Sequence, residues 1–352
     1  MVEIGVKQGT QNVGILGLGV YRPSRVVTND EICQTLDSSD EWIRERSGIA
    51  SRRWVSQDET ALSMSAAAAE RAIENSGVAK SDIGALILAT GSWRTKIPAG
   101  GPQVANAIGI DGIPAFEVNV GCAGFGYGLS VASDMVRAGT TKYVVVIGVE
   151  TLSVVLDNTD RNTAFIFGDG AGAVVVGPSE VNGISPTVWG SDGENALAIS
   201  QNWDIPDYMD RAEAAQNDPD AEPIGRMVIT MQGPKVFRWA AITLPKALSA
   251  AIEQSGVAKE DIEVFIPHQA NSRINELMKA NIGLGDHVPV ANDIETAGNT
   301  SAASIPLAME EMLVNGKAKE GQIALLLGFG AGLSYAGCVV RLPPAPAEAS
   351  AR

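Results

Sequence analysis

Long apolar runs, sulfur and histidine are all scarce in this 352-residue sequence. No uninterrupted apolar run approaches the roughly 20 residues that a membrane-spanning helix needs. The N-terminal residues MVEIGVKQGTQ lack the basic flank and the apolar stretch of a secretory signal. We therefore expect a protein of the cytoplasm that has no membrane partner.

Only three cysteines are present, Cys33, Cys122 and Cys338, and they lie far apart. An odd, dispersed set argues against a disulfide framework and against a metal site, and it favours a reducing compartment. Basic residues are outnumbered, with 26 lysines and arginines against 41 acidic residues and a net charge of −15. A nucleic-acid partner is not expected, because a phosphate backbone demands a basic surface. A small anionic ligand needs only a local basic patch and is not excluded.

The most prominent feature of the sequence is a long internal repeat. AIENSGVAKSDI begins at residue 72 and AIEQSGVAKEDI at residue 251, and ten of their twelve positions are identical. Each copy has the pattern of a helix end, closed by Gly77 or Gly256, with a turn into a strand. The apolar runs KYVVVIGVE and QIALLLGFG, typical of strands buried on both faces, begin 180 residues apart, at 142 and 322. We predict an α/β fold made of two copies of one unit, residues 1–180 and 181–352.

The repeat also predicts where a functional site forms. Aligning Gly121 with Gly298 places Cys122 opposite Asn299, each at the start of a helix. His268 lies near the end of the strand EVFIPHQ in the second copy. Ligand sites of α/β sheets commonly lie at the carboxyl ends of strands, where helices begin. We therefore expect these three polar side chains to meet at one point.

Each of the three also has a plainer structural explanation. A lone cysteine among glycines is most often a buried small hydrophobic residue, and an asparagine before a helix is most often its cap. However, a helix N-terminus lowers a thiol pKa and so activates a cysteine nucleophile. Of the two histidines, His287 has the context of a surface loop, which leaves His268 as the acid–base candidate. A thiol, an imidazole and an amide together suit acyl transfer through a thioester, whereas Cys33 and Cys338 are interpreted as structural.

Five motifs occur in order along the chain: GCAGFGYGL, DRNTAFIFGDGAGAVVVG, FIPHQANSRI, GNTSAASIPLA and GFGAGLSYA. Together they resemble β-ketoacyl-acyl carrier protein synthase III of the actinobacterial type, the condensing enzyme that initiates type II fatty acid synthesis. The resemblance runs from ILGLGVYRP to CVVRLP, which is nearly the whole chain. It implies a duplicated thiolase-like fold in αβαβα layers, with two pseudo-symmetric halves. It also implies a homodimer that needs no cofactor and no metal.

The resemblance assigns the catalytic roles. Cys122 would attack an acyl-CoA and carry the acyl group as a thioester. His268 and Asn299 would hydrogen-bond the thioester carbonyl of malonyl-acyl carrier protein and stabilise the enolate that forms as carbon dioxide leaves. The backbone N–H groups of Cys122 and Ala331 would form the oxyanion hole. Related elongating synthases use two histidines instead, and His287 is unsuited to that role.

Further residues are assigned to substrate binding by the same resemblance. Trp42 would stack on the adenine of CoA, with Arg46 nearby and Arg161 on the other face of the ring. Contacts to the carrier protein would come from Gln269, Ala270, Asn271, Ser272, Arg273, Arg238 and Lys279. Such a patch is needed because carrier proteins are acidic, as is this chain. The alternatives are an interfacial aromatic at Trp42, an ordinary salt bridge at Arg161 and a solvated surface charge at Lys279.

Two segments depart from the family pattern, and a third has no clear pattern of its own. Asn119 and Val120 replace a small Ser-Ala pair, from which we expect altered packing behind the nucleophile. Ile97 occupies the position that reaches from the partner subunit to the end of the acyl pocket, which leads us to expect acyl groups of about two to five carbons on a burial argument. The acidic segment 204–225 lacks a clear periodicity and is expected to be a mobile loop.

Two other classes of function are alternatives to the synthase activity that the resemblance implies. Within the same fold, the chain could be a priming ketosynthase of a polyketide pathway, or an acyltransferase that does not condense. From another class, it could be a binding protein for acyl-CoA or a carrier protein that has no activity. The presence of Cys122, His268 and Asn299 speaks against a binding protein.

Overall fold

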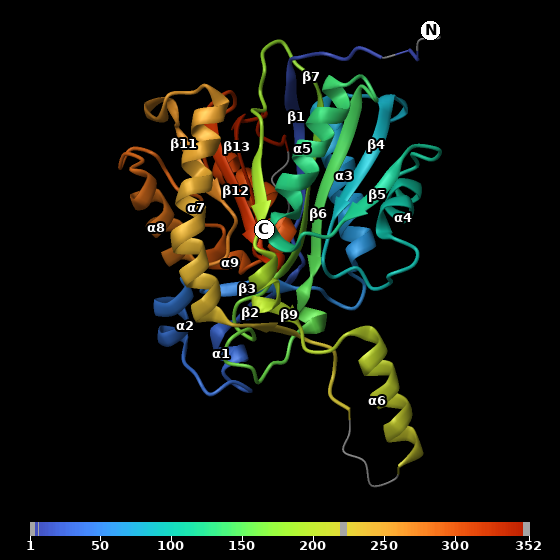
Figure 1. Cartoon of the computed structure of the whole chain (residues 1–352), viewed down its shortest axis with the longest axis vertical. Coiled ribbons are helices and arrows are strands. Elements are labelled where there is room, and N and C mark those ends of the chain that lie inside the picture. The colour runs from blue at the N-terminus through green and yellow to red at the C-terminus, as the bar shows by residue number, and fades with distance from the viewer. Residues whose placement is uncertain (1–3, 6, 219–223, 348–352) are drawn as a thin grey trace.

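The structure is a computed structural model that describes residues 4–5, 7–218 and 224–347. The outer ends of the two predicted halves, 1–3 and 348–352, lie outside the described residues. Within the described parts, no helix combines the length and the apolar character that a membrane crossing requires. The chain forms two sheets with helices between and around them (Figure 1).

The first sheet is built from the first half of the chain. Its strands, in spatial order, are β1 (Val13–Tyr21), β7 (Asp169–Pro178), β6 (Tyr143–Thr151), β4 (Ile83–Ala89) and β5 (Ala115–Val118). The strand β7 is antiparallel to both β1 and β6, while β4 is parallel to both β6 and β5. The middle strands are almost entirely buried, as their continuous apolar runs predict.

The second sheet repeats this order in the second half. Its strands are β8 (Val188–Ser191), β13 (Ser334–Arg341), β12 (Ile323–Gly330) and β11 (Val264–Pro267). The first two pairings are antiparallel and the pairing of β12 with β11 is parallel. A parallel bridge from Phe265 to Val290 occupies the place that β5 has in the first sheet. The predicted duplication of an α/β unit is therefore confirmed, whereas the boundary at residue 180 stays a prediction.

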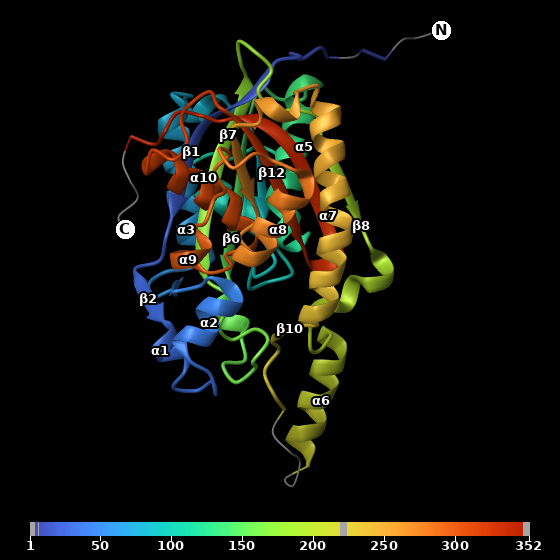
Figure 2. The same cartoon turned by 90° about the vertical axis from the view of Figure 1, so that its left-hand side faces the viewer.

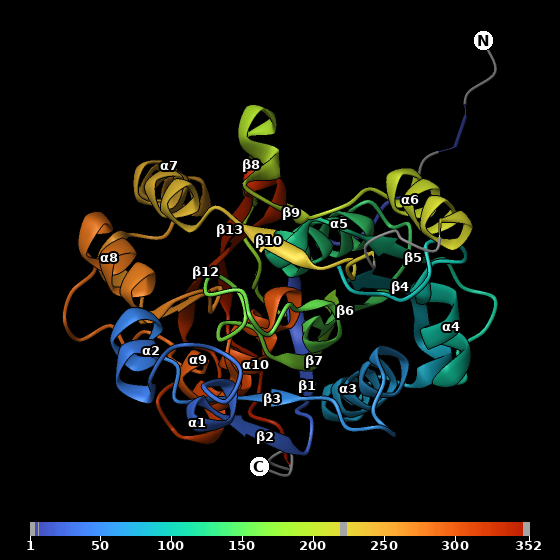
Figure 3. The ribbon, with the colours of Figure 1, turned by 90° about the horizontal axis from the view of Figure 1, so that it is seen from below.

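Helices form the other three layers. In the middle, α5 (Gly124–Arg137) and α10 (Ser304–Val314) contact both sheets. The outer faces are covered by α3 (Ala61–Ser76) and α4 (Gly100–Ala107) on one side and by α7 (Gly233–Ser255) and α8 (Ser272–Ile282) on the other. Viewed from below, these layers follow one another across the molecule (Figure 3). This is the αβαβα arrangement that the family resemblance implies.

The repeated sequence ends the outer helices in the same way. Gly77 closes α3 and Gly256 closes α7, each in the left-handed conformation with φ of 67° and 71°. Glycine adopts this conformation without the steric cost that other residues carry. Both helix ends therefore lie where the repeat predicts them.

The glycines of the motif GCAGFGYGL let α5 lie deep between the sheets. A Cβ atom at Gly126 would lie 2.8 Å from the Ala336 side chain, and one at Gly128 would lie 2.9 Å from Val146. These contacts are too short for any larger residue, so only glycine permits this approach. The close packing holds the N-terminus of α5, and with it Cys122, at the junction of the two sheets.

The lower end of the molecule carries short elements that surround this junction. They are β2 (Arg25–Thr28), α1 (Asn29–Ile32), α2 (Asp40–Ser47), β3 (Ser51–Trp54), β9 (Ile199–Gln201), β10 (Ile229–Met231) and α9 (Ile294–Ala297). From the same end, α6 (Ile205–Asn217) projects beyond the layers (Figure 2).

The expectation of a loop over 204–225 is wrong for its first part, which is the helix α6. Asp204 caps that helix by accepting a hydrogen bond from the Asp207 N–H, and a proline lies in its first turn. These are ordinary helix-start signals, which outweigh the weak periodicity. Residues 219–223 of the segment lie outside the described residues.

Candidate active site

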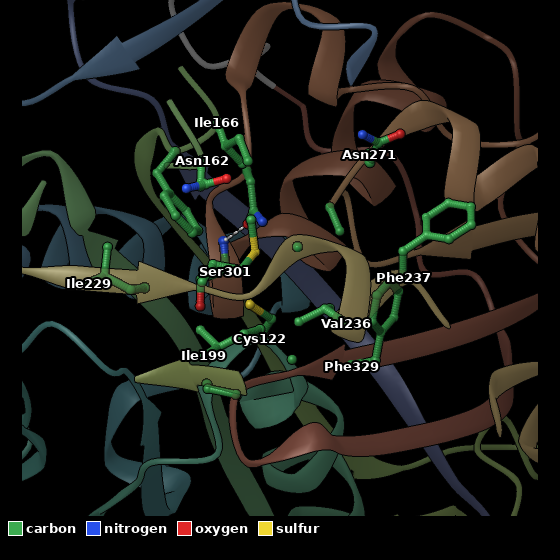
Figure 4. Close-up of a pocket in the computed structure, with 18 of the residues that line it drawn as sticks. Cys122, Asn162, Ile166, Ile199, Ile229, Val236, Phe237, Asn271, Ser301 and Phe329 are labelled. Atoms are coloured by element: carbon green, nitrogen blue, oxygen red, sulfur yellow. Dashed lines mark hydrogen bonds between the residues drawn. The ribbon is translucent and has the colours of Figure 1, made fainter. Parts of the chain in front are cut away.

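A cavity of about 1100 Å³ lies at the junction of the two halves, at the carboxyl ends of β6, β11 and β12. Cys122, His268 and Asn299 all line it, so the three predicted residues meet as expected. Apolar side chains cover much of the remaining wall, among them Ile199, Ile229, Val236, Phe237 and Phe329 (Figure 4). A polar floor under apolar walls suits a substrate with one reactive group and an apolar chain.

The alignment of Cys122 with Asn299 is wrong by three residues. The 3₁₀ turn η2 (Gly121–Ala123) precedes α5, and η6 (Ser301–Ala303) precedes α10 in the same way. Gly121 and Ser301 open these turns with positive φ angles of 51° and 48°. The structural counterpart of Cys122 is thus Ala302, and Asn299 reaches the cavity from the segment before the turn.

Cys122 lies against the loop that follows β12. A Cβ atom at Gly330 would lie 2.7 Å from the Cys122 Cβ, and one at Gly121 would lie 2.8 Å from the Ala331 side chain. This approach brings backbone N–H groups of Cys122 and Ala331 to hydrogen-bond the thiol sulfur. Two such donors at a reacting sulfur are placed to bind an oxyanion that forms beside it.

The expected depression of the Cys122 pKa is not found. Although the residue is only half-buried and opens onto the cavity, the loss of solvent around its sulfur raises the thiol pKa to about 12. The neighbouring Ser301 hydroxyl and the two backbone N–H groups oppose this shift, while the charge of Glu150 adds to it. Burial outweighs the helix N-terminus, so the thiol is protonated before a substrate binds.

The imidazole ring of His268 is buried and has one side-chain hydrogen-bond partner among the described residues. Its Nδ1 lies 2.6 Å from Ser304 Oγ, which also accepts from the Gln269 N–H at 3.4 Å. The Ser304 hydroxyl is therefore free to donate to Nδ1, and that tautomer carries its proton on Nε2. Burial lowers the His268 pKa to about 3, so the ring is neutral at physiological pH. The edge of Phe329 fixes its plane, with ring centroids 5.1 Å apart.

Asn299 has its amide orientation set by the turn that follows it. Its Oδ1 accepts from the Ser301 N–H at 2.8 Å (Figure 4, dashed line). Its backbone is tied to the chain beyond β6 by bonds to Ile166 and Gly168. With Oδ1 occupied, the Nδ2 group is left to donate toward the cavity. A neutral imidazole and an amide thus offer two N–H donors to one substrate carbonyl.

Sequence reasoning missed two residues of the floor, Glu150 and Ser301. Glu150 lies near the end of β6 and lines the cavity, although it is only 1% exposed. Ser301 donates from its hydroxyl to Glu150 Oε1 at 2.9 Å. One signal could have found Glu150, because it is the acidic residue that ends the buried apolar run KYVVVIGVE.

The residues predicted to bind CoA lie together at the cavity mouth. Trp42 packs its edge on Phe165, and the guanidinium groups of Arg46 and Arg161 lie 5.4 and 5.5 Å from its ring centre. Arg161 also lies 3.6 Å from Asp37, a pair exposed enough to exchange readily. An aromatic ring with two cations close to it can bind a flat base and a phosphate.

The residues predicted to contact a carrier protein divide into three groups. Arg238 on α7 and Arg273 on α8 are exposed and line the mouth, as do Ala270 and Asn271. Ser272 is half-buried and bonds Asn292, and Lys279 lies farther along α8 and does not line the cavity. Gln269 is buried and bonds Pro267 and Ile294, and its predicted contact with a carrier protein stays a prediction.

Four further positions that the sequence singled out are Ile97, Asn119, Val120 and His287. Ile97 is 90% exposed and does not line this chain's cavity, so its predicted reach into a partner's acyl pocket stays a prediction. Asn119 lines the cavity and Val120 is half-buried. His287 is exposed, as its loop context predicts. In the described part of the chain, no three His, Cys, Asp or Glu side chains are grouped to hold a metal ion.

Two family models match the chain. The model of 3-oxoacyl-[acyl-carrier-protein] synthase III matches residues 116–193, and the model of its C-terminal part matches residues 252–342. A mycobacterial β-ketoacyl-[acyl-carrier-protein] synthase III from Mycobacterium avium is 52% identical over 98% of this chain and 100% of that protein. A β-ketoacyl-[acyl-carrier-protein] synthase III from Mycobacteroides abscessus is 51% identical over 99% of this chain and 100% of that protein.

Solved structures show the same relationship. The priming β-ketosynthase of the R1128 polyketide pathway superposes with a TM-score of 0.90 and 39% identity, over 97% of this chain and 99% of that one. The 3-oxoacyl-[acyl-carrier-protein] synthase III of Aquifex aeolicus superposes with a TM-score of 0.83 and 33% identity, over 94% and 100%. With two family models and half-identical relatives along nearly its whole length, the chain belongs to the β-ketoacyl-acyl carrier protein synthase III family of condensing acyltransferases.

Proposed function

We propose that the chain condenses an acyl-CoA primer with malonyl-acyl carrier protein and releases 3-oxoacyl-acyl carrier protein and carbon dioxide, the initiating step of fatty acid synthesis. The observation that carries this proposal is the convergence of Cys122, His268 and Asn299 on one cavity with two backbone N–H donors. A thiol nucleophile beside an oxyanion hole suits acyl transfer, and two neutral N–H donors suit enolate stabilisation.

In the first half-reaction, Cys122 attacks the thioester carbonyl of the primer. The N–H groups of Cys122 and Ala331 hold the oxyanion, and collapse of the intermediate expels CoA and leaves the acyl group on the sulfur. The apolar wall, including Ile199 and Ile229, receives the acyl chain.

In the second half-reaction, malonyl-acyl carrier protein occupies the same cavity. His268 Nε2–H and Asn299 Nδ2–H donate to its thioester carbonyl, so that loss of carbon dioxide leaves a stabilised enolate. The enolate carbon attacks the acyl carbonyl, the C–S bond to Cys122 breaks, and the 3-oxoacyl chain leaves on the carrier. Neutral donors suit this step because His268 stays uncharged above its pKa of about 3.

The residues at the cavity mouth bind the two substrates. Trp42, Arg46 and Arg161 hold the CoA nucleotide, and Arg238 and Arg273 meet the acidic carrier protein. The working form is a cytoplasmic homodimer of chains with halves 1–180 and 181–352, in which Ile97 of each chain closes the acyl pocket of the other. The exposed position of Ile97 in a single chain supports this arrangement.

A second candidate function is priming of a polyketide pathway by the same two steps. It is favoured by one observation, the TM-score of 0.90 with the R1128 priming β-ketosynthase. The relatives of higher identity are named as β-ketoacyl-acyl carrier protein synthases III, which favours the first candidate. The two candidates differ in the carrier protein, so kcat/KM with a fatty acid carrier against a polyketide carrier separates them.

The proposal is tested by mixing the chain with acetyl-CoA and malonyl-acyl carrier protein and measuring the carrier mass. We expect 3-oxobutanoyl-acyl carrier protein, with one carbon dioxide and one CoA released per product. Acyl exchange between CoA and carrier without carbon dioxide release would instead indicate an acyltransferase that does not condense. Tight substrate binding without either product would indicate a binding protein.

A further inference from the structure

The cavity floor contains a carboxylate that the proposed steps leave unused. Glu150 is 1% exposed, and among the described residues it forms no ion pair with any cation. Its oxygens accept hydrogen bonds instead from the Gly91 N–H at 3.1 Å and from the hydroxyls of Ser92 and Ser301 at 2.5 and 2.9 Å. A buried carboxylate held only by neutral donors can take up a proton more readily than one paired with a cation.

Ser301 connects this carboxylate to the nucleophile. Its hydroxyl donates to Glu150 Oε1, and its Oγ lies close enough to the Cys122 thiol to accept the thiol proton. Figure 4 shows Ser301 beside Cys122 on the cavity floor. Ser301 adopts a positive φ of 48°, a strained conformation for a residue with a side chain. The fold thus holds a serine, at a cost, at the one turn position that bridges the thiol and the carboxylate.

We propose that Ser301 and Glu150 form a proton relay that takes the proton of the Cys122 thiol when it attacks the acyl-CoA. The thiol gives its proton to Ser301 Oγ while the Ser301 hydroxyl gives its own to Glu150 Oε1. The Cys122 sulfur then forms its bond to the acyl carbon, and the bond from that carbon to the CoA sulfur breaks. The relay runs backwards to protonate the departing CoA thiolate, and Glu150 returns to its carboxylate form. The relay rests on the proposed function, because acylation by acyl-CoA is the step that it serves.

The other groups near the thiol are poor proton acceptors. His268, the remaining base in the cavity, has its pKa lowered to about 3 by burial. Burial raises the pKa of Glu150, so this carboxylate binds a proton more readily than an exposed one. The charge of Glu150 also opposes a thiolate on Cys122, and proton transfer between the two removes that opposition.

A pH-dependent test of Glu150 must distinguish it from the other charged groups around the cavity. The arginines Arg46, Arg161, Arg238 and Arg273 are exposed and lie at the mouth of the cavity. Asp169 on the neighbouring strand β7 is bonded to Ser153 and Val55, and burial raises its pKa to about 6. Above about pH 7.5, neither His268 nor Asp169 therefore changes its charge.

The relay is tested by the pH dependence of the single-turnover rate of Cys122 acylation, followed by mass, in Glu150→Gln and in Ser301→Ala. With the relay intact, the proton stays inside the site, so the rate is level between about pH 7.5 and 9. Without it the proton leaves to solvent, so the rate falls about 10²-fold at the lower pH and rises about tenfold per pH unit. Glu117→Gln is the matched control, because Glu117 lies on β5, bonds Gly100 and does not line the cavity.

A purely structural role predicts a different result. The Asn299 amide is held by the backbone N–H of Ser301, so Ser301→Ala leaves that bond in place, and malonyl-carrier decarboxylation should stay within about threefold of wild type. A level pH profile in either folded variant, or equal losses in both half-reactions, would overturn the relay. If Glu150→Gln does not fold, Ser301→Ala decides alone. Absence of acyl-enzyme in the unmutated chain would instead contradict the proposed function.

Discussion

At the scale of single residues, the site keeps its reactive groups uncharged until a substrate arrives. Burial raises the Cys122 pKa to about 12 and lowers the His268 pKa to about 3, so both are neutral at physiological pH. Neutral groups cost less to bury than charged ones. The reaction then develops negative charge beside donors that are already in place, which is the arrangement that favours the transition state over the ground state.

The lowered pKa of His268 gives a prediction about pH. A histidine with an ordinary pKa near 6.5 would become charged as the pH falls through that value, whereas His268 stays neutral down to about pH 3. Because its folded pKa is depressed, the neutral donor is retained on acidification. We expect the rate of malonyl-carrier decarboxylation to change by less than about twofold between pH 7.5 and 5.5. A tenfold loss centred near pH 6.5, absent from a His268→Gln variant, would contradict this assignment.

Asn299 should act in only one half-reaction. Its side chain donates toward the cavity and does not contribute to the oxyanion hole, so Asn299→Ala should spare acyl loading of Cys122 and slow decarboxylation. The loss of one such donor costs about 10²–10³-fold in rate. Loading measured on the same preparation is the internal control for folding. Decarboxylation within a few-fold of wild type would leave Asn299 with a structural role alone.

Cys122, His268 and Asn299 could be predicted from the sequence because the repeat places each near a strand end or a helix start. Ser301 could not be assigned, because its role depends on a positive φ angle that no local pattern encodes. For Glu150, the acidic end of the buried run KYVVVIGVE was the one available signal. The direction of the Cys122 pKa was predicted wrongly for a related reason. A helix N-terminus is visible in sequence, whereas the loss of solvent around one sulfur atom is not.

At the scale of elements, the duplicated order of strands and helices could be predicted from the sequence. The residue-by-residue correspondence between the turns that precede α5 and α10 could not. Strands and helix ends repeat at offsets of 179 to 180 residues, and so do the turns at Gly121 and Ser301. Aligning Gly121 with Gly298 implies a shorter offset, whereas the structural counterpart of Gly121 is Ser301, a residue other than glycine with a positive φ. At α6, the cap at Asp204 and the following proline are sufficient signals for a helix even though the periodicity is weak.

The loop that carries Ile97 leads to a prediction about primers. If Ile97 of the partner closes the acyl pocket, the chain should prefer acyl groups of about two to five carbons, since each methylene left unburied forfeits about 0.8 kcal/mol. Ile97→Ala should then extend the range toward longer chains. We expect kcat/KM to fall from acetyl-CoA and isobutyryl-CoA to dodecanoyl-CoA in the unmutated enzyme. A clear dodecanoyl preference would show that Ile97 does not limit the pocket.

At the scale of the whole molecule, an acidic chain presents a basic mouth. The net charge is −15, yet Arg238 and Arg273 are exposed at the cavity entrance with Arg46 and Arg161 nearby. An acidic carrier protein is repelled by the molecule as a whole and attracted by this patch alone. We therefore expect carrier binding to depend on the charges at the cavity mouth and not on the net charge of the chain.

Reversal of one charge at the mouth should weaken carrier binding. Arg273→Glu should raise KM for malonyl-acyl carrier protein about fivefold or more, with kcat within about twofold, because a charge at the rim acts on association. Lys319→Glu makes the same change in net charge at an exposed position that does not line the cavity. Equal increases in KM for the two variants would show that the net charge, and not the mouth, governs the encounter.

The central claim, that an acyl group passes through Cys122 to a malonyl-derived carbon, is tested most directly by an isolated acyl-enzyme. The chain is loaded with isotope-labelled acetyl-CoA, freed of CoA, mapped by peptide mass and then given malonyl-acyl carrier protein. We expect one labelled acetyl group on Cys122, none in Cys122→Ser since serine lacks thiolate nucleophilicity, and complete transfer of the label into 3-oxobutanoyl-acyl carrier protein. A label on another residue, or a Cys122 label that malonyl-acyl carrier protein does not remove, would contradict the account.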